Sequence, residues 1–360
     1  MKINHCYQGD CRDVMRQLID ARIKVQCIIT SPPYWGLRDY GVNGQLGQEE
    51  TFSQFLENMK DVFSCCHDIL ADDGTLWLNM GDSYAGSGKG RNKDGSSHHT
   101  GIQASHKGSG AGLIPSFRRD KKEIPKQRSV DFLDGKNLIG QPWRLAFALQ
   151  EQGWYLRQDI IWHKPNPMPE SVKDRCTKAH EYVFLFSKSR QYYFDQAAIR
   201  EPVSANTHAR LSQDIQNQIG SERENGGTKT NGNMKAVYRK STAVGSGCNS
   251  DRIKNNASFD EAMAIMPNDR NRRSVWTIPT EPFSGAHFAT FPQSLVEPCI
   301  LAGSRVGDIV FDPFMGSGTV AQVAQNLGRR WLGTELNHEY IQLQTQRTRQ
   351  LGMLLRDQEF

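Results

Sequence analysis

The sequence contains no run of about 18 consecutive apolar residues, which excludes a transmembrane helix. Residues 1–5 lead directly into a strand-like segment and lack the pattern of a signal peptide. The eight cysteines are scattered and no C-x-x-C pair occurs, which argues against a disulfide framework and against a zinc site. We therefore expect no bound metal, no membrane partner and a location in the reducing cytoplasm.

Positive charge is in modest excess, but it is unevenly distributed along the 360 residues. The net charge is +5, and residues 85–130 alone hold ten lysines and arginines against three acidic residues. Such a composition predicts a mobile basic loop suited to a phosphate backbone, with a solvated insertion without a role as the alternative. A second polar stretch, from about 205 to 273, is a further candidate for a surface that faces nucleic acid.

The remaining sequence alternates between helical and strand-like patterns. Apolar residues recur at helical spacing over 51–70, a turn is expected at 71–74, and 75–80 is typical of a strand. Further elements are expected as a helix over 138–152, strands over 154–162 and 180–187, a helix ending near 302, a strand over 308–311, a helix over 319–327, a strand over 330–335 and a last helix from about 337. This order predicts an α/β fold, with a doubly wound, mostly parallel Rossmann-like sheet, helices on both faces and irregular insertions.

A glycine-rich loop lies near the end of the chain. Residues 316–321 have the spacing G-x-G-x-x-A between a predicted strand and a predicted helix, and Glu335 follows at the end of the next strand. Glycines there allow a ligand to approach the backbone, and the carboxylate can accept hydrogen bonds from ribose hydroxyls. The motif favours an adenosine-containing cofactor, with a simple packing turn as the alternative.

Only one helix can follow Glu335, so the rest of the sheet must come from upstream. Residues 3–8 are suited to be the next strand, with Asp10 just beyond its end, and residues 25–30 form another strand. Because ligands bind beyond the carboxyl ends of parallel strands, residues 10, 31, 34, 312–319 and 335 are expected around one crevice.

Residues 30–35, Thr-Ser-Pro-Pro-Tyr-Trp, follow one of these predicted strands directly. Two consecutive prolines fix their φ angles and remove two amide donors, so the surrounding carbonyls point in set directions. The loop presents hydrogen-bond acceptors and an aromatic face, which suits an amino group on a flat ring such as a nucleobase. A structural turn after a strand is the alternative.

Together, residues 312–319, Asp-Pro-Phe-Met-Gly-Ser-Gly-Thr, and the Ser-Pro-Pro-Tyr loop resemble the amino-group DNA methyltransferases. These enzymes make N4-methylcytosine or N6-methyladenine from S-adenosylmethionine, and the motif order resembles the permuted subgroup called β. The resemblance implies that the methionine part of the cofactor is lined by Asp312, Phe314, Gly316, Ser317, Gly318 and Thr319. It also implies that Glu335 holds the ribose, that Asp10 holds the adenine edge, and that residues 288–292, with Phe288 and Pro292, close the cofactor site. For Asp10 a helix cap is the alternative.

The resemblance makes Ser31, Pro32, Pro33 and Tyr34 the catalytic loop. The Ser31 hydroxyl and the Pro32 carbonyl would accept the amine hydrogens of a base flipped out of double-stranded DNA, and Tyr34 would stack on that base. Serine before Pro-Pro-Tyr favours cytosine N4 over adenine N6 in such families. The only Pro-Cys pair, at 298–299, lies in an apolar helix pattern, so we expect no attacking cysteine.

Contacts to DNA are expected elsewhere too. Trp35 is expected either to line the base pocket or to pack in the core. His163, Lys164 and Asn166 are candidates to touch the nucleotide or its backbone, with a structural turn as the alternative. Arg272 and Arg273 are among the basic residues of the polar stretch that are available for phosphates or guanine edges.

The organisation expected from these assignments has five parts. They are a catalytic part over 1–84, a basic mobile insertion over 85–137, a continuation of the core over 138–200, a target-recognition region over 201–275 and a cofactor-binding part over 276–360. A bacterial, archaeal or phage-encoded setting is expected. The sequence leaves open a homodimer, a companion restriction endonuclease, a DNA-binding module without activity, and an RNA or protein substrate.

Overall fold

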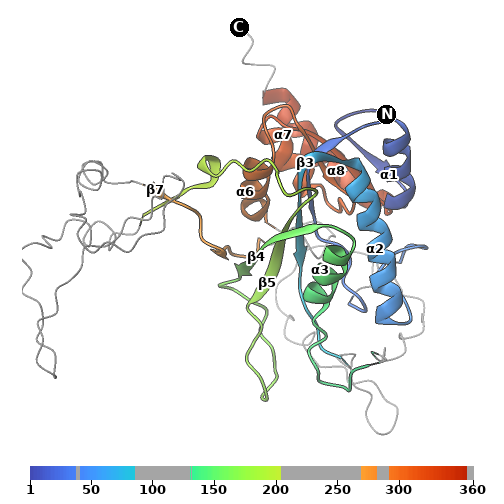
Figure 1. The fold of residues 1–360 in the computed structure, drawn as a ribbon, viewed down its shortest axis with the longest axis vertical. Coiled ribbons are helices and arrows are strands. Elements are labelled where there is room, and N and C mark those ends of the chain that lie inside the picture. Colours follow the sequence, from blue (N-terminus) through green and yellow to red (C-terminus); the bar gives the residue numbers. More distant parts are fainter. Residues whose placement is uncertain (38–40, 86–129, 131, 204–268, 282–291, 355–360) are drawn as a thin grey trace, which may run out of the picture. The chain divides into compact units, whose positions relative to one another are not determined.

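The computed structural model describes the chain except for residues 38–40, 86–129, 131, 204–268, 282–291 and 355–360 (Figure 1). Contacts divide the chain into two compact units, residues 199–272 and the remainder. In the smaller unit, β6 (Glu201–Pro202) pairs antiparallel with β7 (Asp269–Arg270). Most of the predicted basic insertion and most of the predicted target-recognition region lie outside the described residues.

The larger unit is built on a sheet in which eight described strands have the order β1-β10-β9-β2-β3-β5-β4-β8. The strands are β1 (His5–Gln8), β2 (Val25–Thr30), β3 (Leu70–Met80), β4 (Tyr155–His163), β5 (His180–Ser187), β8 (Val275–Thr277), β9 (Ile309–Asp312) and β10 (Arg330–Glu335). All neighbouring pairs are parallel except those that β5 makes with β3 and β4. The predicted mostly parallel, doubly wound sheet is confirmed.

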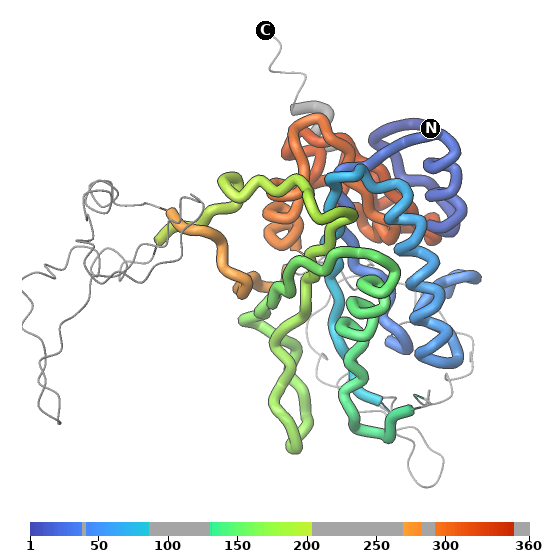
Figure 2. Tube along the Cα trace, in the orientation of Figure 1, coloured from blue at the N-terminus to red at the C-terminus, as the bar shows by residue number. Residues whose placement is uncertain are grey.

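The two ends of the chain meet in this sheet. β1 pairs with β10, and the register places Gln8 beside Glu335. Figure 2 shows the blue N-terminal segment next to the red C-terminal part. An N-terminal strand therefore completes the sheet beside β10, as predicted.

Helices cover both faces of the sheet. They are α1 (Cys11–Asp20), α2 (Phe52–Ile69), α3 (Gln141–Glu151), α6 (Gln293–Gly303), α7 (Thr319–Asn326) and α8 (His338–Leu354). One layer consists of α1, α2 and α3, which pack in that order, and the other consists of α6, α7 and α8.

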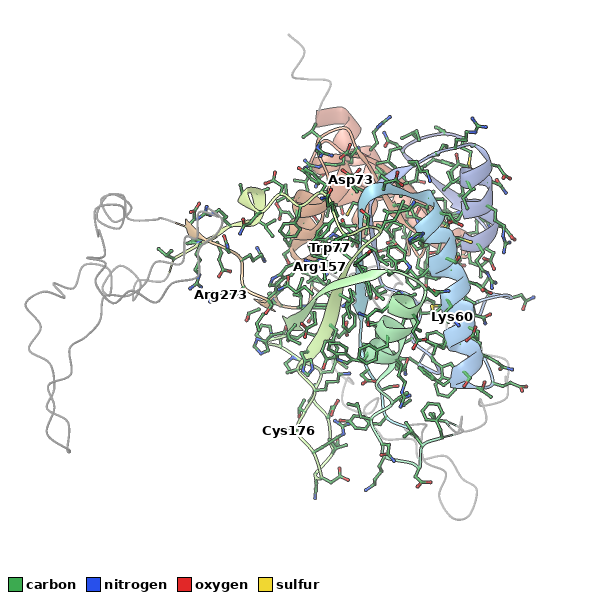
Figure 3. All side chains as sticks on the ribbon, in the orientation of Figure 1. Lys60, Asp73, Trp77, Arg157, Cys176 and Arg273 are labelled. Atoms are coloured by element: carbon green, nitrogen blue, oxygen red, sulfur yellow. The ribbon has the colours of Figure 1, made fainter. Side chains whose placement is uncertain are left out.

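Successive side chains along a strand point to opposite faces of the sheet, so neighbouring residues contact different helix layers. Ile28 is fully buried in the core cluster that contains the apolar faces of α1, α2 and α3. Its neighbour Cys27 points the other way, and its thiol reaches the Cys299 carbonyl in α6. Trp77, labelled in Figure 3, also lies on the α6 side of the sheet. A Cβ at position 303 in α6 would lie 2.9 Å from the Trp77 indole nitrogen and 2.8 Å from the Cys27 thiol, so only glycine fits there.

Two expected boundaries were wrong. The expected turn at 71–74 belongs to β3, because Val25 pairs with Leu70 and Cys27 with Thr75, so the extra residues bulge out of the ladder. The helix expected from 138 starts at Gln141, since Gly140 adopts a left-handed φ of +75° there. The Asp82 carboxylate accepts from the backbone N–H groups of Gly140 and Gln141 and caps this helix from the end of β3.

Among the described residues, no helix is long and apolar enough to cross a membrane. In the same part of the chain, no group of three or more His, Cys, Asp or Glu side chains is placed to bind a metal ion.

Candidate active site

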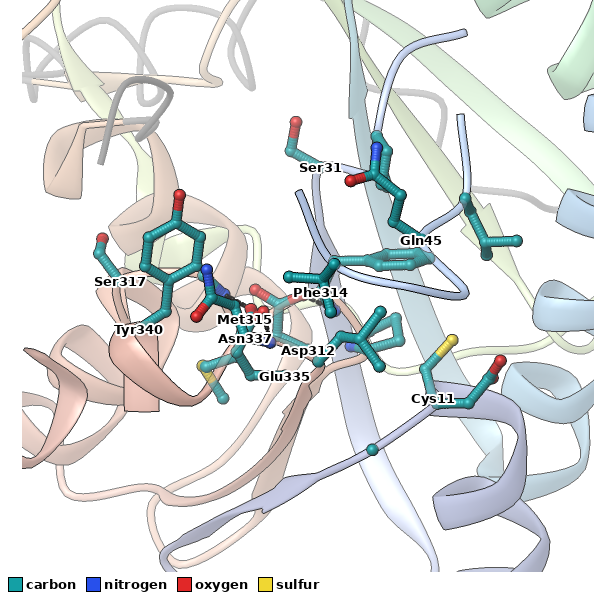
Figure 4. Close-up of a pocket in the computed structure, with 18 of the residues that line it drawn as sticks. Cys11, Ser31, Gln45, Asp312, Phe314, Met315, Ser317, Glu335, Asn337 and Tyr340 are labelled. Carbon is teal, nitrogen blue, oxygen red and sulfur yellow. Dashed lines mark hydrogen bonds between the residues drawn. The ribbon is translucent and has the colours of Figure 1, made fainter. Parts of the chain in front are cut away.

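Four parallel strands end side by side at one edge of the sheet. β9 ends at Asp312, β10 ends at Glu335, β2 ends just before Ser31 and β1 ends just before Gly9. A pocket opens at this edge (Figure 4). The predicted site residues that line it are Asp10, Ser31, Pro33, Asp312, Phe314, Gly316, Ser317, Thr319 and Glu335. The pocket contains residues from both ends of the sequence, as expected, but Tyr34 and Gly318 of the expected crevice are not among its lining residues.

Asp312 is the most buried acidic group of the pocket, with 1% of its surface exposed. Its Oδ1 accepts a 2.7 Å hydrogen bond from the Thr30 hydroxyl and a 2.9 Å bond from the Phe314 N–H. Burial raises the pKa of Asp312 to about 7, the two hydrogen bonds oppose this shift, and the charge of Glu335 adds to it. A cationic group brought into the pocket would favour the ionised form of this carboxyl.

Glu335 holds the glycine loop against the end of β10. Its Oε2 accepts from the Gly316 N–H at 2.8 Å, and its Oε1 accepts from the Asn337 N–H at 2.8 Å. Burial raises the pKa of Glu335, and these backbone bonds act in the opposite direction. Each carboxylate oxygen has a second lone pair, so the group retains acceptors for hydroxyls of a sugar.

The glycine loop adopts backbone angles that favour glycine. Gly316 and Gly318 have φ values of +52° and +85°, and Gly318 is the N-cap residue of α7. A Cβ on Gly318 would lie 2.9 Å from Cγ of Gln344 in α8. Gly318 is not among the pocket-lining residues, so its observed role is to shape the loop.

Two side chains of α8 that the sequence reasoning missed also hold this loop. The Gln344 amide donates to the Gly316 carbonyl at 2.7 Å. The Arg347 guanidinium donates to the hydroxyls of Ser317 and Thr319 at 2.8 and 3.2 Å. No local motif in the sequence of α8 marks Gln344 or Arg347 for these contacts. They become visible only because α8 packs against α7.

A second missed segment lies between the Pro-Pro loop and α2. Val42, Gly44, Gln45 and Leu46 line the pocket, and the Gly47 carbonyl accepts from the Gly36 N–H at 2.9 Å. The run Gly-Val-Asn-Gly-Gln-Leu-Gly over 41–47 is a recognisable glycine-rich signal for a loop that approaches a ligand. Asn337 and Tyr340, at the start of α8, complete the far wall (Figure 4).

Asp10 combines two roles in the structure. It is the N-cap of α1, where its side chain accepts from the Arg12 N–H at 2.8 Å, and it also pairs with the Arg12 guanidinium. Those bonds lower the pKa of Asp10. Because Asp10 also lines the pocket, the helix-cap alternative is realised, and contact with an adenine edge stays a prediction.

The Pro-Pro loop places its residues in different surroundings. Ser31 and Pro33 line the pocket, whereas Pro32 is buried and, like Tyr34, is not among the lining residues. The Tyr34 hydroxyl donates a 3.0 Å hydrogen bond to Glu181 at the start of β5. Stacking of Tyr34 on a base therefore stays a prediction.

Trp35 packs in the core, which is the second of the two places expected for it. Only 4% of its surface is exposed, and its ring packs edge-on against Phe52. The indole N–H donates to the Glu49 carbonyl at 3.0 Å, and the backbone N–H donates to the Gln141 side chain at 3.2 Å. Because the protein itself provides the hydrogen-bond acceptor for the indole N–H and the apolar contact for the ring, Trp35 anchors the Pro-Pro loop to the core.

The last residue of β4, His163, and the residues that follow it lie at the same edge of the sheet. Lys164 forms a salt bridge with Glu181. Asn166 pairs with the backbone of Thr280, and the His163 ring lies 3.1 Å from the Thr277 hydroxyl. Contacts of these three side chains with DNA stay predictions, and each has a structural partner already.

The other predicted positions are not among the residues that line the pocket. Pro292 is buried and is the N-cap residue of α6. Arg273 accepts a 2.8 Å hydrogen bond from the Trp276 indole through its carbonyl, and Arg272 ends the smaller unit. Phe288 lies outside the described residues, so the predicted closing segment cannot be placed.

Comparisons with known proteins agree with this geometry. The sequence model of the N6/N4 family, described as DNA methylase, matches residues 25–346. The chain belongs to this family of DNA methylases. It is 40% identical to the type II methyltransferase M.Cfr9I of Citrobacter freundii over 95% of the chain and 86% of that protein. It is 41% identical to the type II methyltransferase M.SmaI of Serratia marcescens over 94% of the chain and 88% of that protein.

Solved structures show the same fold at lower identity. PvuII DNA methyltransferase (cytosine-N4-specific) is 16% identical, with a TM-score of 0.51 over 95% of this chain and 85% of that one. A putative DNA modification methylase from Thermus thermophilus, complexed with S-adenosyl-L-methionine, is 20% identical, with a TM-score of 0.50 over 95% and 92%. The resemblance to amino-group DNA methyltransferases is confirmed, and S-adenosylmethionine is the methyl donor of that family.

Proposed function

We propose that this protein transfers a methyl group from S-adenosylmethionine to the exocyclic amine of a base in double-stranded DNA, with cytosine N4 as the acceptor. The observation that carries the proposal is that Ser31 and Asp312 line one pocket. The loop suited to hold an amine thus adjoins the loop suited to hold the cofactor, which is the geometry that a direct displacement requires.

The pocket fits the chemistry of the cofactor. Two carboxylates, Asp312 and Glu335, face a ligand that carries positive charge and ribose hydroxyls, and Phe314 and Leu46 supply apolar surface for a ring. When bound, S-adenosylmethionine supplies an electrophilic methyl group. We assign the ammonium group of the methionine part to Asp312 and the ribose to Glu335.

The Ser31 hydroxyl and the Pro32 carbonyl are the proposed acceptors for the two amine hydrogens. Bonds that draw these hydrogens out of the ring plane localise the nitrogen lone pair, which then attacks the methyl carbon while the carbon–sulfur bond breaks. The methylated amine afterwards releases one proton. A covalent enzyme intermediate is unnecessary, and Cys299, 2% exposed within α6, is buried away from the pocket.

The resemblance to families in which serine before Pro-Pro-Tyr accompanies cytosine N4 favours this acceptor over adenine N6, because Ser31 stands at that position. The alternative acceptor is adenine N6, since both bases present an amine with two hydrogens to the same acceptors.

The type II names of the relatives support a partner restriction endonuclease. A homodimer is a further proposal, which size-exclusion chromatography with light scattering would test.

The experiment is incubation of the protein with tritium-labelled S-adenosylmethionine and DNA amplified in vitro, followed by digestion to nucleosides and chromatography with mass detection. We expect label in N4-methylcytosine. Label in N6-methyladenine would support the alternative and refute the assigned base. Label only in RNA or protein, offered in parallel, would refute DNA methylation, and DNA binding without transfer to any substrate would indicate a binding module. Modification-sensitive sequencing of the same DNA then gives the target sequence.

A further inference from the structure

The catalytic-loop tyrosine is held from a strand far away in the sequence. The Tyr34 hydroxyl donates a 3.0 Å hydrogen bond to Oε2 of Glu181, the second residue of β5. The same oxygen accepts a 3.3 Å bond from the Asn79 amide in β3. The amide also donates to the Tyr182 carbonyl at 3.1 Å, which fixes it in place. The phenol thus meets an acceptor that two neighbouring strands orient.

The second oxygen of Glu181 has a partner of its own. The Lys164 ammonium pairs with Oε1, and both side chains are only 18% exposed. Lys164 also lies 4.2 Å from the centre of the Trp162 ring, which limits its movement. A carboxylate with partners on both oxygens cannot rotate away from Tyr34 without breaking a shielded ion pair.

Glycine at position 81 makes this arrangement sterically feasible. A Cβ there would lie 3.0 Å from Cε2 of Tyr34 and 3.2 Å from Cδ of Glu181. The tyrosine ring and the carboxylate therefore pack directly on the backbone at the end of β3. This contact leaves little freedom for the ring plane.

The phenol stays a donor under working conditions. Burial raises the pKa of Tyr34 well above its ordinary value, and the charge of Glu181 acts in the same direction. The phenol proton that Tyr34 donates to Glu181 is therefore retained near neutral pH.

We propose that Glu181 is a positioning residue for methyl transfer: through the Tyr34 hydroxyl it fixes the tyrosine next to the Ser31 acceptor, and Lys164 holds Glu181 in place. This inference rests on the proposed function, because it assumes that the loop receives the target base. Lys164 then acts through Glu181 and not by direct contact with the nucleotide. A ring set at the wrong angle would present the amine poorly to the methyl group, and a displacement of about 1 Å can cost about a hundredfold in rate.

The test compares variants in the tritium-transfer assay on DNA amplified in vitro, with cofactor affinity measured by calorimetry. We expect Glu181→Ala to lower kcat about tenfold to a hundredfold, with the Kd for S-adenosylmethionine within about twofold of the wild type. Glu181→Gln should retain more activity than Glu181→Ala, because its amide oxygen can still accept from the phenol while the Lys164 ion pair is lost. Tyr34→Phe should lower kcat while it keeps the ring.

The decisive variant is the double one, Tyr34→Phe with Glu181→Ala. Because both changes break one contact, we expect its kcat to equal that of Glu181→Ala alone. The matched control is Glu57→Gln, which removes the exposed Glu57–Lys60 pair on α2 and should leave kcat unchanged.

Several outcomes would overturn the inference. They are wild-type kcat in Glu181→Ala, losses that multiply in the double variant, or losses that only follow a lower melting temperature or weaker cofactor binding. Wild-type protein that methylates no base would instead refute the proposed function, and with it the premise of this inference.

Discussion

The Thr30 hydroxyl donates a 2.7 Å hydrogen bond to the Asp312 carboxylate across 282 positions of sequence. Thr30 is the last residue of the strand that precedes the Pro-Pro loop, and Asp312 is the last residue of the strand that precedes the glycine loop. Both side chains are buried, so the bond joins the strand ends from which the Pro-Pro loop and the glycine loop begin. The distance between these two loops is therefore set by the sheet.

Cofactor affinity should depend on pH through Asp312. Burial raises the pKa of this carboxyl to about 7, and only its ionised form can pair with the ammonium group of the cofactor. We expect binding about tenfold weaker at pH 6 than at pH 8, since each pH unit below the pKa costs up to about 1.4 kcal/mol. Calorimetric titrations at both pH values check this. The Asp312→Asn variant is the control, because any pH dependence that it retains comes from titration of the cofactor itself. If its affinity varied with pH as much as that of the wild type, the assignment of the ammonium group to Asp312 would be contradicted.

Asp312→Asn should also change how stability varies with pH. The folded-state pKa is raised, so the carboxyl contributes most stability when protonated, and this contribution is lost as pH rises from about 4 through 7. Asparagine keeps an oxygen for Thr30 and Phe314 and carries no charge. We therefore expect the variant to gain stability relative to the wild type by at most about 1.4 kcal/mol per pH unit over that range. Urea unfolding of the cofactor-free proteins at pH 5 and pH 8 measures this gain. If the free energies of unfolding of the variant and the wild type differed by the same amount at both pH values, the raised pKa of Asp312 would be refuted.

Gly318→Ala should weaken cofactor binding more than a glycine replacement elsewhere with the same backbone angle. Gly318 and Gly307 have φ values of +85° and +84°, so alanine costs about 1–2 kcal/mol in backbone strain at either position. A Cβ at 318 also lies 2.9 Å from Gln344, whereas a Cβ at 307 has nothing within 4 Å. Gln344 holds the Gly316 carbonyl, so only the first change distorts the loop. We expect about tenfold weaker binding in Gly318→Ala alone, corresponding to about 1.4 kcal/mol. Equal affinities of the two variants would argue against the role of α8.

Ser31→Ala should keep cofactor binding and lose most methyl transfer. The change removes one small hydroxyl from the pocket rim and leaves both carboxylates in place. We expect kcat to fall by about a hundredfold, in the range found when one charge-stabilising donor or acceptor is removed from an active site. The tritium-transfer assay measures the loss, and Ser53→Ala on the exposed face of α2 is the control. Unchanged turnover would refute the assigned role of Ser31.

Much of the fold was predictable because its determinants are local. Hydrophobic periodicity and the glycine spacing identify the strands that end at Asp312 and Glu335, and the strand-like pattern over residues 3–8 indicates β1, which pairs with β10. The motif order also predicts which loops share an edge, because parallel strands align their carboxyl ends. The helix boundary at Gln141 was missed because its cap, Asp82, is distant in sequence.

The surroundings of individual side chains were less predictable. Trp35 has the same local sequence whether it lines a base pocket or packs on Phe52, and only the placement of α2 decides between them. Lys164 has the charge expected of a DNA contact, yet its partner is Glu181 on the antiparallel strand β5. Neither pairing has a signature in residue spacing.

The fold class, the family and the two loops proposed to carry the chemistry could be predicted from the sequence, since they depend on periodicity and on motifs within a few residues. The hydrogen bond between Thr30 and Asp312, the hold of α8 on the glycine loop through Gln344, and the bond from Tyr34 to Glu181 became visible only in the folded chain. The physical reason is that a side-chain hydrogen bond is specified by the packing of whole elements to within a fraction of an ångström. Such packing joins residues whose separation along the chain is arbitrary.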